Sequence, residues 1–144
     1  MTGALRLPAK SVEEIVRAAA ETPSVEICGL LVDAGQGLTA HLTPNRHPEP
    51  ERGFAICDAA HARIQREARA RGGRIVGCFH SHPSGDTAPS EMDLLAAHED
   101  GFIWLICAPD GRLQAWRARM RGGVKSFVPL SLELHPIAEN ASAH

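Results

Sequence analysis

Residues 74–93 read RIVGCFHSHPSGDTAPSEMD and predict a strand, a loop and a helix in direct succession. The apolar run Arg74–Phe79 is typical of a buried strand, and it leads into His80. The segment that follows contains prolines and a glycine, so we expect a loop. A helix is expected from Ser90 to about Glu99, with Ser90 as its N-cap. We expect the other elements of the chain to pack around this strand–loop–helix unit.

The same segment carries a candidate metal site. His80 and His82 are two residues apart, and alternate side chains of an extended segment point the same way. Pro83 favours an extended conformation at His82. Asp93 would lie in the first turn of the following helix. Two imidazoles and one carboxylate are typical ligands of a catalytic zinc, which keeps a fourth position open.

Simpler interpretations exist for each part. Ser90 and Asp93 are also what a helix N-cap followed by an acidic third position would look like. The two roles are compatible, because the cap would fix the helix that orients Asp93. We interpret the remaining histidines as surface or hydrogen-bonded residues: His41, His47, His61, His98, His135 and His144.

A hydrolytic zinc site also needs a base that takes a proton from water. Glu26 is the candidate, because it lies near the start of the apolar run Val25–Val32, which predicts a buried strand. An acid without a partner would be costly there. The alternative, in which Glu26 only marks the solvent end of that strand, stays open at this point.

Strands and helices alternate in the first two thirds of the chain, and strands dominate the last third. Two helices are expected: one over 8–20, with Ser11 as N-cap and Glu14 completing a capping box, and one from Asp58 to about Arg71. A loop is expected over 43–52. The expected strands are one near Leu38–Leu42, a short one at Phe54–Cys57, and three over Phe102–Ala108, Leu113–Arg117 and Val124–Leu134. The pattern predicts an α/β (α+β) fold, a mixed sheet flanked by helices. Residues 1–136 would form one domain and 137–144 a disordered tail.

Composition excludes several classes of protein. The net charge of −2 provides no overall basic field for nucleic acid or an anionic membrane. No run approaches the ~18 apolar residues of a membrane span, and the N-terminus lacks the apolar core of a signal peptide. The four cysteines form no Cys-x-x-Cys pair, which argues against a structural zinc site. They lie in apolar runs, so we expect them to be buried and reduced, in a cytoplasmic protein.

Three segments together resemble the JAMM/MPN+ family of zinc metalloproteases. The family motif is a glutamate on an early strand, then His-Ser/Thr-His-Pro, six residues, and Ser-x-x-Asp. This chain has Glu26 followed by Ile-Cys-Gly-Leu-Leu, His80-Ser-His-Pro at 80–83, and Ser-Glu-Met-Asp at 90–93. Every motif position is filled.

The resemblance implies a fold similar to cytidine deaminase and one Zn²⁺ per chain, held by His80, His82 and Asp93. Glu26 would be the general acid/base. Ser90 would donate a hydrogen bond to the oxyanion, an interaction often worth ~3–4 kcal/mol. The implied reaction is hydrolysis of a peptide or isopeptide bond in a protein or peptide substrate.

The substrate expected from the resemblance is a ubiquitin-like sulfur-carrier protein, cleaved at its C-terminal diglycine. Small bacterial members of the family are linked to such carriers, and the loops at 34–37 and 83–89 are short here. Two alternatives remain: a RadC-like protein associated with DNA repair, suggested by the Pro-Ser-Gly-Asp sequence at 83–86, and a non-catalytic MPN scaffold. A zinc nucleoside deaminase is excluded, because Cys107-Ala-Pro-Asp lacks the required Pro-Cys-x-x-Cys ligand pair.

Overall fold

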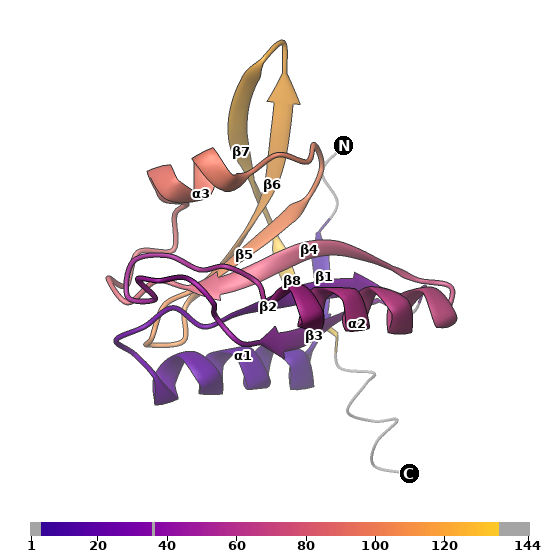
Figure 1. Cartoon of the computed structure of the whole chain (residues 1–144), viewed down its shortest axis with the longest axis horizontal. Coiled ribbons are helices and arrows are strands. Elements are labelled where there is room, and N and C mark those ends of the chain that lie inside the picture. Colours follow the sequence, from indigo (N-terminus) through magenta and orange to yellow (C-terminus); the bar gives the residue numbers. More distant parts are fainter. Residues whose placement is uncertain (1–3, 36, 136–144) are drawn as a thin grey trace.

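The computed structural model describes residues 4–35 and 37–135 (Figure 1). In chain order the elements are β1 (Leu5–Pro8), α1 (Ala9–Glu21), β2 (Cys28–Asp33), β3 (Leu38–Thr43), α2 (Asp58–Ala70), β4 (Arg74–Ser81), α3 (Glu91–Ala96), β5 (Ile103–Cys107), β6 (Leu113–Arg121), β7 (Val124–Leu130) and β8 (Leu132–His135). The tail predicted at 137–144 lies outside the described residues. No helix among those described is long and apolar enough to cross a membrane.

Six strands form one mixed sheet in the spatial order β3-β2-β4-β5-β6-β7. Within it, β4 and β5 are parallel, and the other neighbouring strands are antiparallel. A parallel pair needs a long connection, and here that connection contains α3. The prediction of a mixed sheet flanked by helices is confirmed.

Two apolar cores lie on opposite faces of this sheet, because successive side chains of a strand point in opposite directions. Leu31 of β2 packs in the cluster that contains Ile15 of α1. Its neighbour Leu30 packs in the cluster that contains Ile64 of α2. The sheet is therefore buried between α1 and α2, and β4 in its middle carries His80.

A separate parallel pair joins the two ends of the described chain. β1 pairs with β8, with Leu5 opposite Leu132, and the Leu5 N–H donates to the Ser131 carbonyl at 2.7 Å. The single strand predicted over Val124–Leu134 is wrong: β7 ends at Leu130 and β8 leaves the main sheet to pair with β1. Pairing between chain ends has no local signal in the sequence, which is why neither β1 nor the break was predicted.

Helix boundaries also differ from the predictions. Ser11 is buried inside α1, whose N-cap is Pro8, and no side chain caps this end. By contrast, α2 begins at Asp58 and ends at Ala70, close to the predicted range, with Cys57 as its N-cap. The helix after Ser90 ends at Ala96, short of the predicted end. Pro8 is the last residue of β1 and is extended, with φ −59° and ψ 142°, and α1 begins directly after it, before the predicted serine cap.

The connection between β3 and α2 is irregular. The short strand predicted at Phe54–Cys57 is reduced to one bridge between Asn45 and Ile56. Cys57 is therefore only partly buried, contrary to the prediction, whereas Cys28, Cys78 and Cys107 are buried as predicted. All four thiols are free.

Candidate metal centre

The structure brings the side chains of His80, His82 and Asp93 to one point. The two imidazole Nε2 atoms are 3.0 Å apart, and Asp93 Oδ2 lies 3.1 Å from each of them. Zinc bonds of about 2.0–2.1 Å in a tetrahedron correspond to ligand separations of about 3.3 Å. All three side chains are buried, with residue exposures of 0%, 7% and 5%. The donor set and its spacing therefore fit one zinc ion.

Hydrogen bonds around His82 prepare its ring for a metal. Its backbone N–H donates to the Cys107 carbonyl at 2.9 Å. Its Nδ1 lies 2.7 Å from the Asp86 carbonyl oxygen, which can only accept, so Nδ1 carries the proton and the Nε2 lone pair faces the site. The intervening Ser81 faces away, as predicted: its Oγ accepts the Ile27 N–H at 2.9 Å.

The ring of His80 is held by packing. Its Nδ1 is buried and has no hydrogen-bond partner within residues 4–35 and 37–135. Phe54 stacks on the imidazole with a centroid distance of 4.3 Å and an interplanar angle of 22°. Trp104 approaches edge-on at 5.9 Å. No local pattern in the sequence predicted these aromatic contacts. They hold the ring of His80, which in metal sites is usually held by a second hydrogen bond.

Asp93 reaches the site through the cap of α3. The Ser90 N–H donates to Asp93 Oδ2 at 2.9 Å, and the Asp93 N–H donates to Ser90 Oγ at 3.0 Å. This reciprocal capping box fixes the carboxylate. The capping interpretation is confirmed, and the cap is what orients Asp93. Ser90 is exposed, and its hydroxyl hydrogen stays available to a further acceptor.

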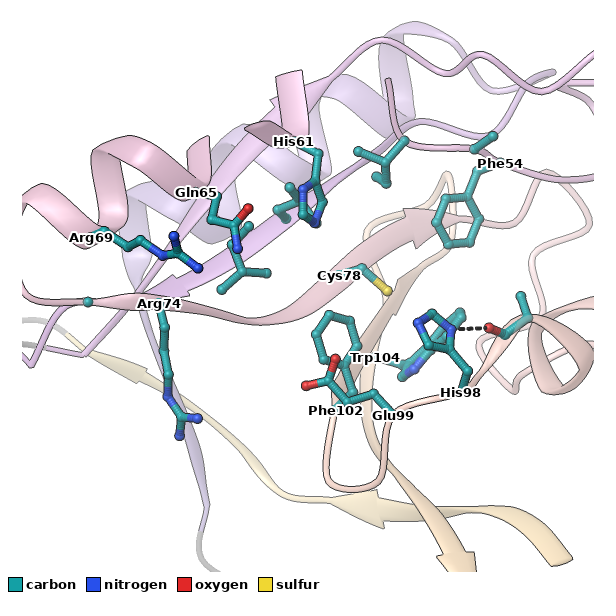
Figure 2. Close-up of a pocket in the computed structure, with 16 residues that line it drawn as sticks. Phe54, His61, Gln65, Arg69, Arg74, Cys78, His98, Glu99, Phe102 and Trp104 are labelled. Carbon is teal, nitrogen blue, oxygen red and sulfur yellow. Dashed lines mark hydrogen bonds between the residues drawn. The ribbon is translucent and has the colours of Figure 1, made fainter. Parts of the chain in front are cut away.

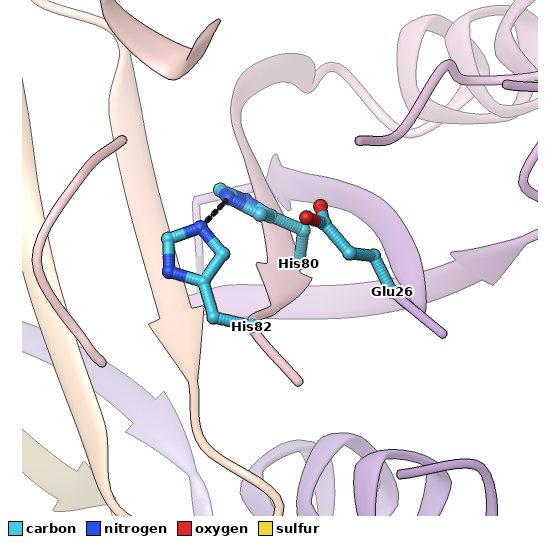
Figure 3. Close-up of side chains that lie close together, drawn as sticks. All are labelled: Glu26, His80 and His82. Atoms are coloured by element: carbon cyan, nitrogen blue, oxygen red, sulfur yellow. Dashed lines mark hydrogen bonds between the residues drawn. The ribbon is translucent and has the colours of Figure 1, made fainter. Parts of the chain in front are cut away.

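Glu26 lies beside the two histidines although it is far from them in sequence (Figure 3). One of its carboxylate oxygens and one ring nitrogen of each histidine all lie within 4.8 Å of one another. Glu26 precedes β2, which begins at Cys28 and not at the predicted start of the run. Its residue exposure is 5%, so it does not mark a solvent-exposed strand end. Its Oε1 is buried without a hydrogen-bond partner in the described residues.

Burial also sets the ionisation of the site. It raises the pKa of Glu26 to about 7, with nearby His82 acting in the opposite direction. It lowers the pKa of His80, which favours the neutral imidazole. Burial opposes the charge of Asp93, but hydrogen bonding to His80 and His82 outweighs it and holds the Asp93 pKa well below its usual range. Burial lowers the pKa of His82, but hydrogen bonds to Asp93 and to the Asp86 backbone outweigh it and raise that pKa. The neutral imidazole and the ionised carboxylate are the forms that bind metals, so metal binding at His82 would displace a proton.

Two choices of carboxylate are possible for a third ligand, Asp93 or Glu26. Asp93 is closer, at 3.1 Å from both Nε2 atoms, and the cap of α3 holds it in place. Glu26 is farther away and is the carboxylate that lacks a partner. A metal ion next to the two Nε2 atoms would therefore lie closer to the Asp93 carboxylate, and the Glu26 carboxylate would lie beside it.

A pocket of about 570 Å³ adjoins this centre on the α2 side of the sheet (Figure 2). Phe54 and Trp104 line one end of it, and both also contact the ring of His80. Arg69 and Arg74 lie at the other end. The pocket therefore shares a wall with the metal centre.

Two curated proteins, both named desampylase, are similar to this chain in sequence. A desampylase of Haloferax volcanii is 36% identical over 100 residues, which cover 67% of this chain and 72% of that protein. A desampylase of Pyrococcus furiosus is 32% identical over 94 residues, 65% of this chain and 66% of that protein.

Solved structures share the fold at low sequence identity. A protein from Desulfitobacterium hafniense superposes with a TM-score of 0.72 and 22% identity, over 92% of this chain and 93% of that one. A JAB1/MPN domain protein from Archaeoglobus fulgidus has a TM-score of 0.57 and 19% identity, over 91% and 99%. A structure described as the JAMM metalloprotease-like zinc site of the proteasome and signalosome has a TM-score of 0.55 and 18% identity, over 91% and 99%.

The family model named Prok-JAB, prokaryotic homologs of the JAB domain, matches residues 8–119. That range contains Glu26, both histidines, Ser90 and Asp93. The resemblance seen in the sequence is thereby confirmed, and the chain belongs to the family of prokaryotic homologs of the JAB domain.

Proposed function

We propose that this protein is a zinc metallopeptidase that hydrolyses a peptide or isopeptide bond. The observation that carries the proposal is the pair of Nε2 atoms and the Asp93 carboxylate at 3.0–3.1 Å from one another. A zinc ion held there would act as a Lewis acid on a carbonyl oxygen and would lower the pKa of water to about 7.

Glu26 would move the proton in this reaction. Its carboxylate lies within 4.8 Å of the histidine nitrogens, and its Oε1 has no partner among the described residues. A pKa raised to about 7 by burial lets it accept a proton from water and return it to the leaving amine near neutral pH. Acid–base catalysis of this kind contributes about 10²–10⁴-fold.

Ser90 would stabilise the oxyanion. Its Oγ already accepts the Asp93 N–H, so the orientation of the hydroxyl is fixed while its hydrogen is free to donate. The serine is exposed at the start of α3, where a substrate can reach it. Removal of a single oxyanion donor typically costs about 10²–10³-fold in kcat.

The substrate we propose is a ubiquitin-like sulfur-carrier protein, cut after its C-terminal diglycine. The similarity to two desampylases supports a protein-conjugated substrate. The proposed ligands are 0–7% exposed, and a diglycine end, which has no side chains beside the scissile bond, would need the least room to reach them. The four free thiols agree with a cytoplasmic location.

The test uses a purified, zinc-loaded chain and a sulfur carrier whose diglycine is joined to a lysine-containing reporter peptide. We expect a cut after the second glycine, read by intact mass, with activity lost in EDTA and restored by Zn²⁺. A carrier that ends in Ala-Ala is the matched control and should remain uncut. If every diglycine conjugate stays intact, the proposed substrate is wrong. A protein that binds no metal would favour the scaffold alternative.

A further inference from the structure

The side-chain amide of Asn45 makes four hydrogen bonds next to the metal centre. Its Nδ2 donates to the carbonyl oxygens of Glu26 at 2.9 Å and Gly53 at 3.1 Å. Its Oδ1 accepts the backbone N–H groups of His47 and Ala55, each at 3.0 Å. Two donors and two lone pairs are the full capacity of an amide side chain. Every donor and acceptor of the Asn45 side chain is therefore occupied, and this side chain in the connection 44–57 is a junction between four main-chain groups.

This junction holds two groups of the site at once. One bond anchors the main chain of Glu26, whose N–H is also held by the Pro50 carbonyl at 2.7 Å. Another bond anchors Ala55, the neighbour of Phe54. Phe54 in turn stacks on the ring of His80 at 4.3 Å. The Asn45 side chain thus supports both the proposed base, Glu26, and the ring that packs on the proposed ligand His80.

The sheet holds Ile27 through Ser81 of β4, but the C=O and N–H of Glu26 itself are held by Asn45 and Pro50 of the connection 44–57. The residue lies before Cys28, where β2 and its ladder of hydrogen bonds begin. Its carboxylate oxygen Oε1 has no partner in the part of the chain that the structure describes. The direction of the carboxylate therefore depends on where the main chain is held. A misplacement of about 1 Å in a catalytic group can cost about 10²-fold in rate.

We propose that Asn45 is a positioning residue of this site, which fixes the main chain of Glu26 and, through Ala55, the ring of Phe54 against His80. It acts through these residues, and the four hydrogen bonds of its side chain go to none of the three proposed ligands. The kinetic part of the inference rests on the proposed function, and the structural part stands without it.

Two substitutions distinguish the hydrogen bonds that Asn45 donates from those that it accepts. Asn45→Asp, assayed at pH 8 where the new side chain is charged, keeps the acceptor for the His47 and Ala55 N–H groups. It cannot donate to Glu26 or Gly53. We expect kcat to fall on the order of 10- to 100-fold with KM and zinc content unchanged. Asn45→Ala loses all four bonds, so it should lower kcat similarly and also free Phe54.

Two readouts report the site without catalysis. The first is hydrogen exchange of the Glu26 and Ala55 amides: Asn45→Asp should speed exchange at Glu26 only, and Asn45→Ala at both. The second is the visible spectrum of the Co²⁺-substituted protein. It should change in Asn45→Ala, where the His80 ring loses its support, and remain that of the wild type in Asn45→Asp.

His47→Ala is the matched control on the same connection. It removes the bond from the Glu49 N–H to His47 Nδ1 and leaves the four bonds of Asn45 in place. We expect kcat within about twofold of the wild type, whatever happens to the melting temperature. Equal losses of kcat in this variant and in Asn45→Asp would mean that loosening the loop is sufficient, and would overturn a specific role for Asn45.

The remaining outcomes also decide the inference. Wild-type kcat and wild-type protection of the Glu26 amide in Asn45→Asp overturn it, as does a loss of kcat that only follows a loss of zinc. If the wild type cleaves no substrate, the proposed function fails, and amide exchange and the Co²⁺ spectrum still test the position of Glu26 and Phe54. If Asn45→Ala does not fold, Asn45→Asp carries the test.

Discussion

The phenyl ring of Phe54 stacks on the imidazole of His80 at a centroid distance of 4.3 Å. Metal-binding histidines usually donate their second nitrogen to a fixed acceptor, but Nδ1 of His80 has none within the described residues. Packing against Phe54 therefore holds the ring of this proposed ligand, where a hydrogen bond usually holds it.

Phe54→Ala should weaken zinc binding on the order of 10- to 100-fold, because it releases the ring of His80. Competition with a chromogenic chelator measures the change. Phe102→Ala is the matched control: Phe102 packs in the same apolar cluster and lines the same pocket, yet no ring contact joins it to His80. Equal zinc affinities in the two variants would show that the stacking has no role in metal binding.

Glu26→Gln should keep its zinc and lose about 10²–10⁴-fold in kcat, because the amide cannot take a proton and no ligand is removed. Zinc content by mass spectrometry and turnover of the conjugate are measured on the same sample. Glu49→Gln, on the exposed part of the loop, is the control and should be fully active. Normal turnover in Glu26→Gln would mean that another group is the base.

His82→Ala should bind zinc far less tightly, because one of three ligands is lost and the Asp93 carboxylate loses a partner at 3.1 Å. Equilibrium dialysis reports the metal content. His98→Ala replaces an exposed histidine and should bind one zinc like the wild type. Tight zinc binding by His82→Ala would refute its role as a ligand.

Ser90→Gly separates capping from catalysis. Glycine at an N-cap costs only a few tenths of a kcal/mol, whereas alanine costs about 1 kcal/mol. The glycine variant should therefore unfold at nearly the wild-type denaturant midpoint while kcat falls about 10²–10³-fold through the missing oxyanion donor. If kcat falls only in Ser90→Ala, in step with its stability, the serine acts as a cap alone.

The cysteines should differ in their reactivity. Hydrogen bonds from the backbone of Ala60 and from Arg46 lower the pKa of Cys57, whereas burial raises the pKa of Cys107 to about 11. The thiolate is the reactive form, so iodoacetamide at pH 7.5 should modify Cys57 first in the native protein. Its rate should rise with pH through a midpoint below the ordinary thiol value.

Peptide mass mapping after short labelling identifies the modified thiol. Cys28 and Cys78, whose pKa values burial also raises, should remain unlabelled until the protein unfolds. Labelling of Cys107 as fast as Cys57 would contradict the prediction.

Much of the candidate centre was predictable because its contacts are local. His80 and His82 are neighbours on one extended segment, and the capping box joins Ser90 to Asp93 within one helical turn. Such contacts depend on backbone geometry that a few consecutive residues determine. Helices α1 and α2 and most strands of the sheet were predictable for a similar reason, because their apolar periodicity is local.

Contacts between distant segments could not be predicted in this way. Asn45 carries no periodic or motif signal, and its four bonds go to backbone groups, which every residue has. The same holds for the Asp86 carbonyl at His82 and for the pairing of β1 with β8. Phe54 appeared as one apolar residue before a helix, and nothing local indicated that it covers His80.

The amino-acid sequence by itself determined the mixed fold and the spacing of His80, His82 and Asp93, because short-range geometry and apolar periodicity are encoded within single elements. It left open whether Glu26 was buried or solvent-exposed. Only the tertiary structure decided this, since the Pro50 carbonyl and the Asn45 amide hold Glu26 beside the histidines. Those contacts join residues far apart in the chain, and they exist only once the sheet has paired and the connection 44–57 has folded over it.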